Sequence, residues 1–265
     1  MTATTVSAPT QARNVLASEW IKLRSVRSTY LVLLFAAAAA VGIGYLVARA
    51  DVTHSSMSAA EKAAFDPVSS SFTGLGLAQL AFGALGVLVI SSEYTTGLIR
   101  TTFAAVPRRR AVLAAKAAAV GAVTLLAGEL IAVATFLAGQ QALSAQHLNV
   151  TLANPGALRG VLAAGFYLAV MAWVGLGLGA VIRRTAGAIT ATVGVVFLLP
   201  QIVHALPAPW DTRIGRLTLD GAAQQMIAQH PHAGYFSAGP SFLIVAAYAA
   251  AAIAAAAFVI TRRDA

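Results

Sequence analysis

Long apolar stretches alternate with short polar segments along the whole chain. Six stretches approach the roughly 20 residues that an α-helix needs to cross a hydrocarbon core of about 30 Å. They are residues 30–48, 71–92, 117–138, 161–182, 186–206 and 242–260. Lipid offers no hydrogen bonds to the backbone, so stretches of this length predict helices rather than the shorter strands of a barrel. The pattern predicts an all-α integral membrane protein with six transmembrane helices over residues 29–260.

A polar and basic segment, residues 93–116, separates the second and third predicted spans. Three apolar residues recur in it at helical spacing: Ile99, Phe103 and Val106. Arg100 and Thr101 point away from this stripe, so the pattern predicts a short amphipathic helix whose apolar face packs on a partner or on the helix ends. Pro107 ends this helix, and the basic residues Arg108, Arg109 and Arg110 follow it.

Lysine and arginine residues are divided unevenly between the two sides of the six-span arrangement. Thirteen of the 18 lie on the side that holds both termini and segment 93–116. Cytoplasmic loops of membrane proteins carry an excess of Lys and Arg. We therefore expect a cytosolic N-terminus (1–28), a cytosolic tail (261–265), and an extracellular or re-entrant connection (207–241) with a short helix around Ala222–Gln229. The predicted location is the cell membrane, with multiple passes.

The segment before the first span has an amphipathic pattern of its own. One stripe holds Leu16, Trp20 and Leu23, and the opposite side holds Ser18, Lys22 and Ser25. A basic amphipathic helix with a tryptophan is suited to lying in the membrane interface, against lipid. The alternative is a plain cytosolic extension of the first span.

Composition agrees with a membrane protein and narrows its chemistry. The 265 residues are 58% hydrophobic and 10% charged, whereas soluble domains carry about 25% charged residues. The net charge of +9 is spread between apolar runs and is not interleaved with exposed aromatics, so we expect no nucleic-acid partner. The chain has no cysteine, and His230 and His232 have no third ligand placed by the sequence, so we expect no metal site.

Few polar side chains fall inside the predicted spans. Glu129 is the one carboxylate well inside a span, and an ionisable residue there is a functional hypothesis because charge is costly in lipid. It could bind a cation, carry a proton or couple to an ion. The alternative is a protonated or cavity-facing group held by a partner such as Gln79. Gln79, Thr190 and Thr192 could line the same pathway.

No nucleotide-binding or catalytic motif is present in the sequence. A phosphate-binding loop of the Walker type needs a Gly-Lys pair, and the chain has none, so an ATPase would be a separate polypeptide. Gly175 and Gly179 lie inside the fourth predicted span, where they suit close helix packing rather than phosphate binding. We expect a protein that is not an enzyme and holds no cofactor itself.

Three groups of residues, placed within this six-span frame, carry a resemblance to a known family. They are SEWIKLRS at residues 18–25, which includes Glu19; Glu93, Tyr94, Gly97, Arg100, Pro107, Arg108, Arg109 and Lys116; and RRDA at residues 262–265. Over nearly its whole length the chain resembles permease subunits of ABC transporters, of the ABC-type-two membrane family and especially its compact actinobacterial members.

The resemblance implies an assembly and a division of roles. Two six-helix permease subunits, identical or different, would pair above two cytosolic ATPase subunits that bind ATP and Mg²⁺. The helix before the first span would lie on the inner membrane surface. A coupling helix at about Thr95–Ala105 would fit a groove in the ATPase, and residues 220–241 would correspond to short re-entrant helices, although Pro and Gly residues there disfavour a regular hairpin.

The resulting functional prediction is an ATP-driven exporter of a lipophilic drug, antibiotic or peptide. Two other classes stay open at this point. One is an ATP-independent channel or secondary carrier that uses Glu129. The other is a membrane immunity or scaffold protein. Segment 93–116 also has a simpler interpretation, in which its arginines only orient the protein in the membrane.

Overall fold

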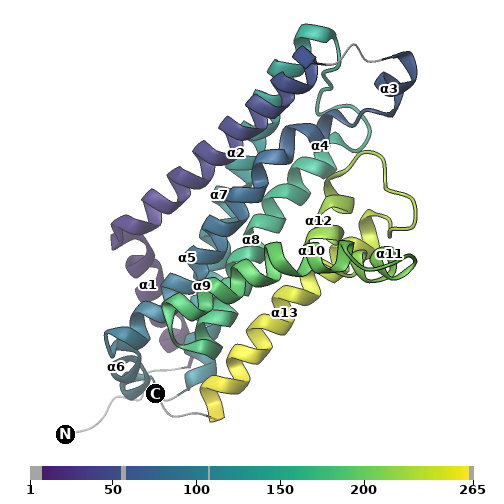
Figure 1. Ribbon diagram of the computed structural model, residues 1–265. Coiled ribbons are helices and arrows are strands. Elements are labelled where there is room, and N and C mark those ends of the chain that lie inside the picture. The colour runs from purple at the N-terminus through teal and green to yellow at the C-terminus, as the bar shows by residue number, and fades with distance from the viewer. Residues whose placement is uncertain (1–7, 55–57, 107, 263–265) are drawn as a thin grey trace, which may run out of the picture.

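The computed structural model describes residues 8–54, 58–106 and 108–262, and these residues form helices and no strands. The long helices are α1 (Ala8–Ser25), α2 (Arg27–His54), α5 (Leu75–Thr95), α7 (Arg109–Leu143), α8 (Ala157–Ile182) and α13 (Ala238–Arg262). The shorter helical elements are α3 (Ala59–Ala64), α4 (Pro67–Ser71), η1 (Phe72–Gly74), α6 (Leu98–Ala105), η2 (Ser144–Gln146), α9 (Thr185–Val193), η3 (Gly194–Leu198), α10 (Leu199–His204), α11 (Trp210–Gly215) and α12 (Leu219–Ile227). Helices α1 and α6 lie at the same end of the bundle as the last turns of α13, and α3 and α12 lie toward the other end (Figure 1).

Six helical stretches in the described residues are long and apolar enough to cross a membrane, which confirms the six predicted helices. They are Arg27–Asp51, Pro67–Thr95, Arg109–Gln146, Ala157–Ile182, Thr185–His204 and Ala238–Arg262. Most extend beyond the predicted apolar ranges. Backbone hydrogen bonds continue a helix through polar residues, so the limit of hydrophobicity is not the limit of the helix.

The polar segment 93–116 is divided among three helices. Glu93 and Tyr94 belong to the last turn of α5, and the residues from Arg109 to Lys116 form the first turns of α7. Gly97 separates α5 from α6 with a left-handed backbone (φ 74°), which glycine adopts without steric cost. The short helix therefore begins at Leu98, three residues later than the expected Thr95–Ala105. Pro107 lies outside the described residues.

Helices α5 and α8 pack almost backbone to backbone at the centre of the bundle. A Cβ atom on Gly86 would lie 1.9 Å from the carbonyl oxygen of Ala172, and one on Gly175 would lie 2.0 Å from that of Gly83. Only glycine allows an approach this close, and small residues are the usual means of tight helix packing in lipid. The packing role predicted for Gly175 is confirmed.

The fifth predicted span is interrupted in its middle. Helix α9 passes into the π-helical turn η3 and then into α10, whose second residue is Pro200. Proline has no backbone N–H to donate to the preceding turn, which accounts for a wider turn just before it.

The connection 207–241 holds two short helices, α11 and α12. Helix α12 packs against α8 and α13 and buries Leu219, Ala222, Ala223, Met226 and Ile227. The hydroxyl oxygen of Thr218 accepts a hydrogen bond from the backbone N–H of Gly221 at 3.1 Å and caps the helix. This cap explains why α12 begins three residues before the expected helix at Ala222–Gln229.

Helix α1 packs against α7, and the face that it buries holds both apolar and charged residues. Val15, Glu19 and Leu23, spaced four residues apart, are buried. Leu16 and Trp20 lie at the edge of this face and are 42% and 39% exposed. The predicted stripe of Leu16, Trp20 and Leu23 is therefore divided, because the buried face is centred on the charged residue Glu19.

Candidate functional site

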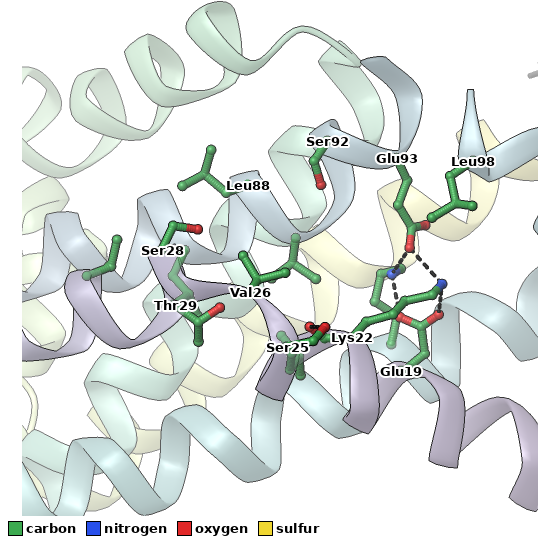
Figure 2. Close-up of a pocket in the computed structure, with 15 residues that line it drawn as sticks. Glu19, Lys22, Ser25, Val26, Ser28, Thr29, Leu88, Ser92, Glu93 and Leu98 are labelled. Carbon is green, nitrogen blue, oxygen red and sulfur yellow. Dashed lines mark hydrogen bonds and ion pairs between the residues drawn. The ribbon is translucent and has the colours of Figure 1, made fainter. Parts of the chain in front are cut away.

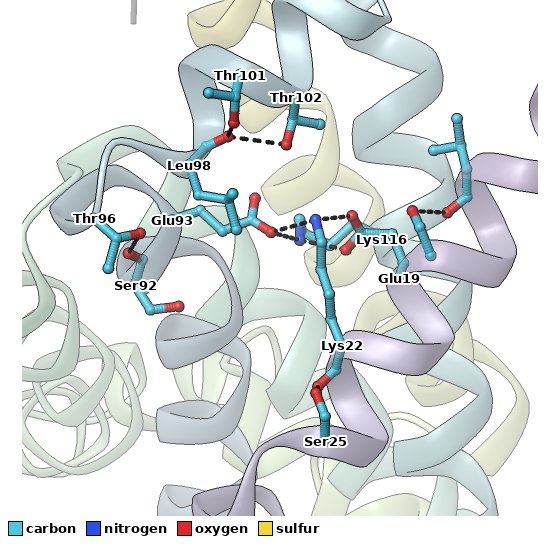
Figure 3. A network of polar contacts seen from close by, with 12 residues as sticks. Glu19, Lys22, Ser25, Ser92, Glu93, Thr96, Leu98, Thr101, Thr102 and Lys116 are labelled. Atoms are coloured by element: carbon cyan, nitrogen blue, oxygen red, sulfur yellow. Dashed lines mark hydrogen bonds and ion pairs between the residues drawn. The ribbon is translucent and has the colours of Figure 1, made fainter.

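Four charged side chains meet where α1, α5 and α7 converge beside α6, and we call them the charge cluster: Glu19, Lys22, Glu93 and Lys116. The Nζ atom of Lys116 contacts Glu19 and lies 2.9 Å from Oε1 of Glu93. The Nζ atom of Lys22 lies 2.7 Å from Oε1 of Glu19 and 2.9 Å from Oε1 of Glu93. Figure 3 shows that each lysine bridges the two carboxylates.

Three members of the charge cluster are buried. The side chains of Glu19 and Lys116 are 2% exposed and that of Glu93 is 5% exposed, whereas Lys22 reaches solvent. Two carboxylates and two ammonium groups cancel in formal charge. A buried ion network of this kind adds little stability relative to apolar packing, but loss of one partner leaves an uncompensated charge. The cluster therefore holds α1, α5 and α7 in one mutual arrangement.

Lys22 occupies the outer side of the cluster, and its pKa reflects two opposing causes. Partial burial alone would lower the pKa of this ammonium group. The hydrogen bonds from Lys22 to Glu19 and Glu93, together with their negative charge, outweigh burial and raise the pKa above its usual value of 10.5. Lys22 is therefore charged across the physiological pH range.

A cavity of about 240 Å³ opens beside the charge cluster. Its other walls are largely apolar and come from the first turns of α2 and the last turns of α5, including Val32, Leu85 and Val89 (Figure 2). Leu98, the first residue of α6, also lines it. The cavity therefore adjoins both the first turn of α6 and the charge cluster.

Helix α6 is held to the bundle by its apolar face. Ile99 is 3% exposed, and Phe103 packs against the main core. The guanidinium of Arg109, at the start of α7, lies 5.4 Å from the Phe103 ring centre. The same guanidinium donates a hydrogen bond to the carbonyl oxygen of Ile260 in α13 at 3.2 Å. Phe103 and Arg109 therefore connect α6 with both α7 and α13.

A second cation–π contact connects α5 with the end of α8. The guanidinium of Arg183, which follows α8, lies 5.0 Å from the ring centre of Tyr94. Arg183 adopts a left-handed backbone (φ 60°) where the chain turns from α8 into α9. Tyr94 is half-buried among these groups. Helices α1, α5, α7, α8 and α13 are thus all joined by polar or cation–π contacts close to α6.

The opposite face of α6 is exposed. Arg100 and Thr101 point outward, Leu98 is 44% exposed, and Arg108 lies exposed just before α7. The Thr101 hydroxyl donates to the carbonyl oxygen of Leu98 at 2.8 Å within the helix. The structure thus puts Ile99 and Phe103 against the chain's own helices and leaves Arg100 and Thr101 outside. The side chain of Glu93 is turned away from this surface.

The residues proposed as a pathway do not line a common cavity. Gln79 accepts a hydrogen bond from the Tyr167 hydroxyl in a cavity that Asp220 also lines, and burial raises the pKa of Asp220. Thr192 is buried, and its hydroxyl donates to its own helix at 2.9 Å, whereas Thr190 is exposed. Glu129 lines a separate groove. The suggested pairing of Glu129 with Gln79 is wrong, because the amide is turned toward Tyr167 instead.

The sequence does not predict the charge cluster. Glu19, on the predicted interface helix, and Lys116, at the end of segment 93–116, both belong to the residues that carry the family resemblance, but no contact between them is expected from their positions. Two signals in the sequence pointed to burial. Glu19 stands between Val15 and Leu23 on one helical face, and Lys116 stands among alanines with Val112 and Val120 four residues away on either side.

Comparison of the sequence with protein-family models and with curated proteins gives no match. The six apolar helices indicate a multi-pass membrane protein.

Proposed function

We propose that this chain is the transmembrane subunit of an ATP-driven exporter, powered by a separate ABC-type ATPase that binds ATP and Mg²⁺. The observation that carries the proposal is the construction of α6. Its outer face is exposed at Arg100 and Thr101, while its inner face and flanking residues are joined to α1, α5, α7, α8 and α13. A protein that pushed on Arg100 and Thr101 would therefore move several spans together.

The resemblance to ABC-type-two permeases supplies the partner for that surface. In this assignment α6 is the coupling helix, and the α6 end of the bundle faces the cytosol in agreement with the Lys and Arg distribution. The exposed Leu16 and Trp20 of α1 then lie against the inner membrane surface. A second permease subunit, identical or different, completes the transporter.

The mechanism follows from differential binding. ATP draws the two ATPase subunits together, which displaces the α6 helices docked in their grooves. Ile99 and Phe103 transmit the displacement to the ends of α5 and α7, and the charge cluster keeps α1 in step with them. The bundles shift between two packings that expose the transport path to opposite sides. The apolar surfaces of the spans suit a lipophilic drug, antibiotic or peptide as cargo.

The docking surface can be tested by charge reversal on α6. The chain, co-expressed with ABC-type ATPases from the same genome, is expected to retain one of them on purification. Arg100→Glu is expected to reduce the retained ATPase at least tenfold, because Arg100 is exposed on the outer face of α6. Arg24→Glu changes another exposed arginine, on α1, and is the matched control, which is expected to retain the ATPase.

Two results would contradict the proposal. One is failure of the unmodified chain to retain any of these ATPases. The other is equal loss of the ATPase in both charge-reversal variants, which would show that overall charge, and not α6, governs association.

A transport measurement separates the exporter from the carrier built on Glu129. ATP-loaded vesicles that contain the complex are expected to move a lipophilic cargo, and removal of ATP is expected to stop the movement. Transport that continues without the ATPase and is abolished by Glu129→Gln would favour the carrier instead.

A further inference from the structure

A membrane-facing groove lies far from α6, between α7, α8 and the start of α13. Its volume is about 630 Å³, and α12 contributes Met226 to its wall. Most of its lining is apolar, and the surrounding leucines are widely exposed, with Leu158 and Leu162 each 52% exposed. In a six-span membrane protein, such a surface faces lipid. We call it the Glu129 groove.

Glu129 is the only carboxylate among the residues that line this groove. Its Oε2 atom is buried and has no hydrogen-bond partner among the described residues. The carboxyl group rests directly on Gly165 of α8, where an added Cβ atom would lie 2.4 Å from Cδ of Glu129. Glycine at this position therefore makes the space that the carboxyl group occupies.

Arg159 lines the same groove but is occupied elsewhere. Its guanidinium donates a hydrogen bond to the carbonyl oxygen of Ala228 at 2.6 Å. Arg159 precedes Gly165 by six residues on α8, which places the two backbone positions roughly 9 Å apart along the helix axis. Glu129 forms no ion pair among the residues that the structure describes, so no direct counterion faces its carboxyl group there.

An aromatic pair forms another wall of the groove. Phe166 of α8 and Phe242 of α13 stack with ring centres 4.7 Å apart and planes inclined by 27°. Phe242 is 45% exposed, so part of this pair faces the surroundings of the protein. Aromatic faces attract cations as well as apolar groups, and the attraction grows when the cation is shielded from water.

We propose that the Glu129 groove binds a lipophilic monocation that enters from the membrane. A carboxylate in apolar surroundings is costly without a counterion, and a bound cation offsets that cost. A neutral apolar ligand would cover the carboxyl group and leave it without a partner. An anion would be repelled by Glu129, and Arg159 at the other end of the groove disfavours a second positive charge on the ligand.

The inference deepens the proposed export function by naming the chemical class of the cargo, and it rests on that function only for the role of the site in transport. Binding itself requires the permease chain alone. The two proposals can therefore fail separately.

The test uses a pair of rigid ions of similar size and opposite charge. Purified chain in nanodiscs of phosphatidylcholine is titrated with tetraphenylphosphonium and with tetraphenylborate, and empty nanodiscs provide the background. We expect saturable binding of tetraphenylphosphonium and none of tetraphenylborate. Glu129→Gln is expected to weaken tetraphenylphosphonium binding at least tenfold, because it removes the negative charge with little change of shape.

Two further variants separate the site from general effects of charge and folding. Glu61→Gln removes a carboxylate at the start of α3, where glutamine preserves the capping interaction with Ser58, and is expected to bind like the unmodified chain. Phe242→Ala is expected to weaken binding threefold or more through loss of the stacked pair. Each variant is compared only as a monodisperse preparation.

The possible results divide cleanly. Equal binding of both ions, or unchanged tetraphenylphosphonium affinity in both Glu129→Gln and Phe242→Ala, would overturn the site. Loss of binding in Glu129→Gln together with intact ATP-driven transport of tetraphenylphosphonium would leave the exporter standing and overturn the groove as its cargo site. Specific binding without ATP-driven transport would uphold the site and count against the exporter.

Discussion

The charge cluster and the Glu129 groove both place a carboxylate in largely apolar surroundings, but they differ in the partners that the carboxylate has. At the charge cluster, Glu19 and Glu93 share two ammonium groups at hydrogen-bonding distance. In the groove, Glu129 has an unpartnered oxygen and no ion pair among the described residues. In the first arrangement both carboxylates form ion pairs with lysines of the chain, which holds the helices together, although Oε2 of Glu93 also has no hydrogen-bond partner among the described residues. In the second arrangement the carboxyl group has no ion pair among the described residues, and that is what makes it a candidate binding site.

The difference shows that burial of a charged group does not by itself indicate function. In a buried ion network, attraction between the internal partners offsets the cost of desolvation, so removal of one partner lowers the stability of the fold. Glu129 is only partly exposed, and its buried Oε2 atom has no partner to offset that cost, so loss of its charge should mainly affect the binding of a ligand. Substitutions that remove one charge from either region should therefore differ in what they disturb.

Lys116→Met is expected to produce the largest loss of stability. It leaves Glu19 and Glu93 buried with Lys22 alone, and loss of one member of a buried ion pair typically costs about 3 to 5 kcal/mol. Thermal unfolding of the purified protein in detergent would show a markedly lower midpoint. The double variant Glu93→Gln with Lys116→Met should recover part of the loss. A single variant as stable as the unmodified chain would contradict the structural role of the cluster.

Arg109→Gln is expected to have an intermediate effect. It removes the cation–π contact with Phe103 and the hydrogen bond to Ile260, which together typically amount to about 1 to 2 kcal/mol. Hydrogen exchange should show that the variant opens α6 faster than the unmodified chain does, with a smaller change in α8. Arg110→Gln, an exposed neighbour one residue further on, is the control and should leave α6 unchanged.

Lys22→Met is expected to have a smaller effect that depends on pH. Because the pKa of Lys22 is raised in the folded chain, its stabilising contribution is present below the usual value of 10.5 and is lost as pH rises through the folded pKa. The partly exposed side chain limits this contribution to below about 1 kcal/mol. Unfolding midpoints of both proteins should differ at neutral pH and converge at strongly alkaline pH. A difference that grows with pH would contradict this account.

Glu129→Gln is expected to have the smallest effect on stability, within about 0.5 kcal/mol, because no hydrogen bond or ion pair is lost. Glu93→Gln makes the same chemical change in the charge cluster. It should lower the free energy of unfolding more, since it leaves Lys116 with one carboxylate instead of two. Thermal unfolding of the two variants side by side measures the contrast directly. Equal losses would remove the distinction between the two regions.

Parts of the candidate site could be predicted from local patterns. The apolar stripe that includes Ile99 and Phe103 indicated the short helix α6, and its outward residues Arg100 and Thr101 are exposed as their spacing implies. The first residue of α6 was not predictable from that stripe. It depends on Gly97, because a glycine is compatible with a continuous helix as well as with the left-handed backbone that it adopts here.

The partners of the polar residues could not be predicted from local sequence patterns. Gln79 could have faced Glu129 or Tyr167, because several rotations of the helices are compatible with spans that are apolar on nearly every side. Glycine contacts between α5 and α8 select one rotation of these two helices, in which Gln79 reaches Tyr167. Close packing of α7 on α8 through Gly128 and Gly165 places Glu129 against Gly165.

The sequence alone determined the helical class, the six long apolar helices and the amphipathic character of α6. These properties depend on the hydrophobicity and spacing of residues that are neighbours in the sequence, so they can be predicted from the sequence. Only the tertiary structure decided that Glu19 meets Lys116 across 97 positions of sequence and that Glu129 has no ion-pair partner in the part of the chain that the structure describes. Pairings of this kind depend on how helices rotate against one another, and that rotation is set by close packing between distant segments.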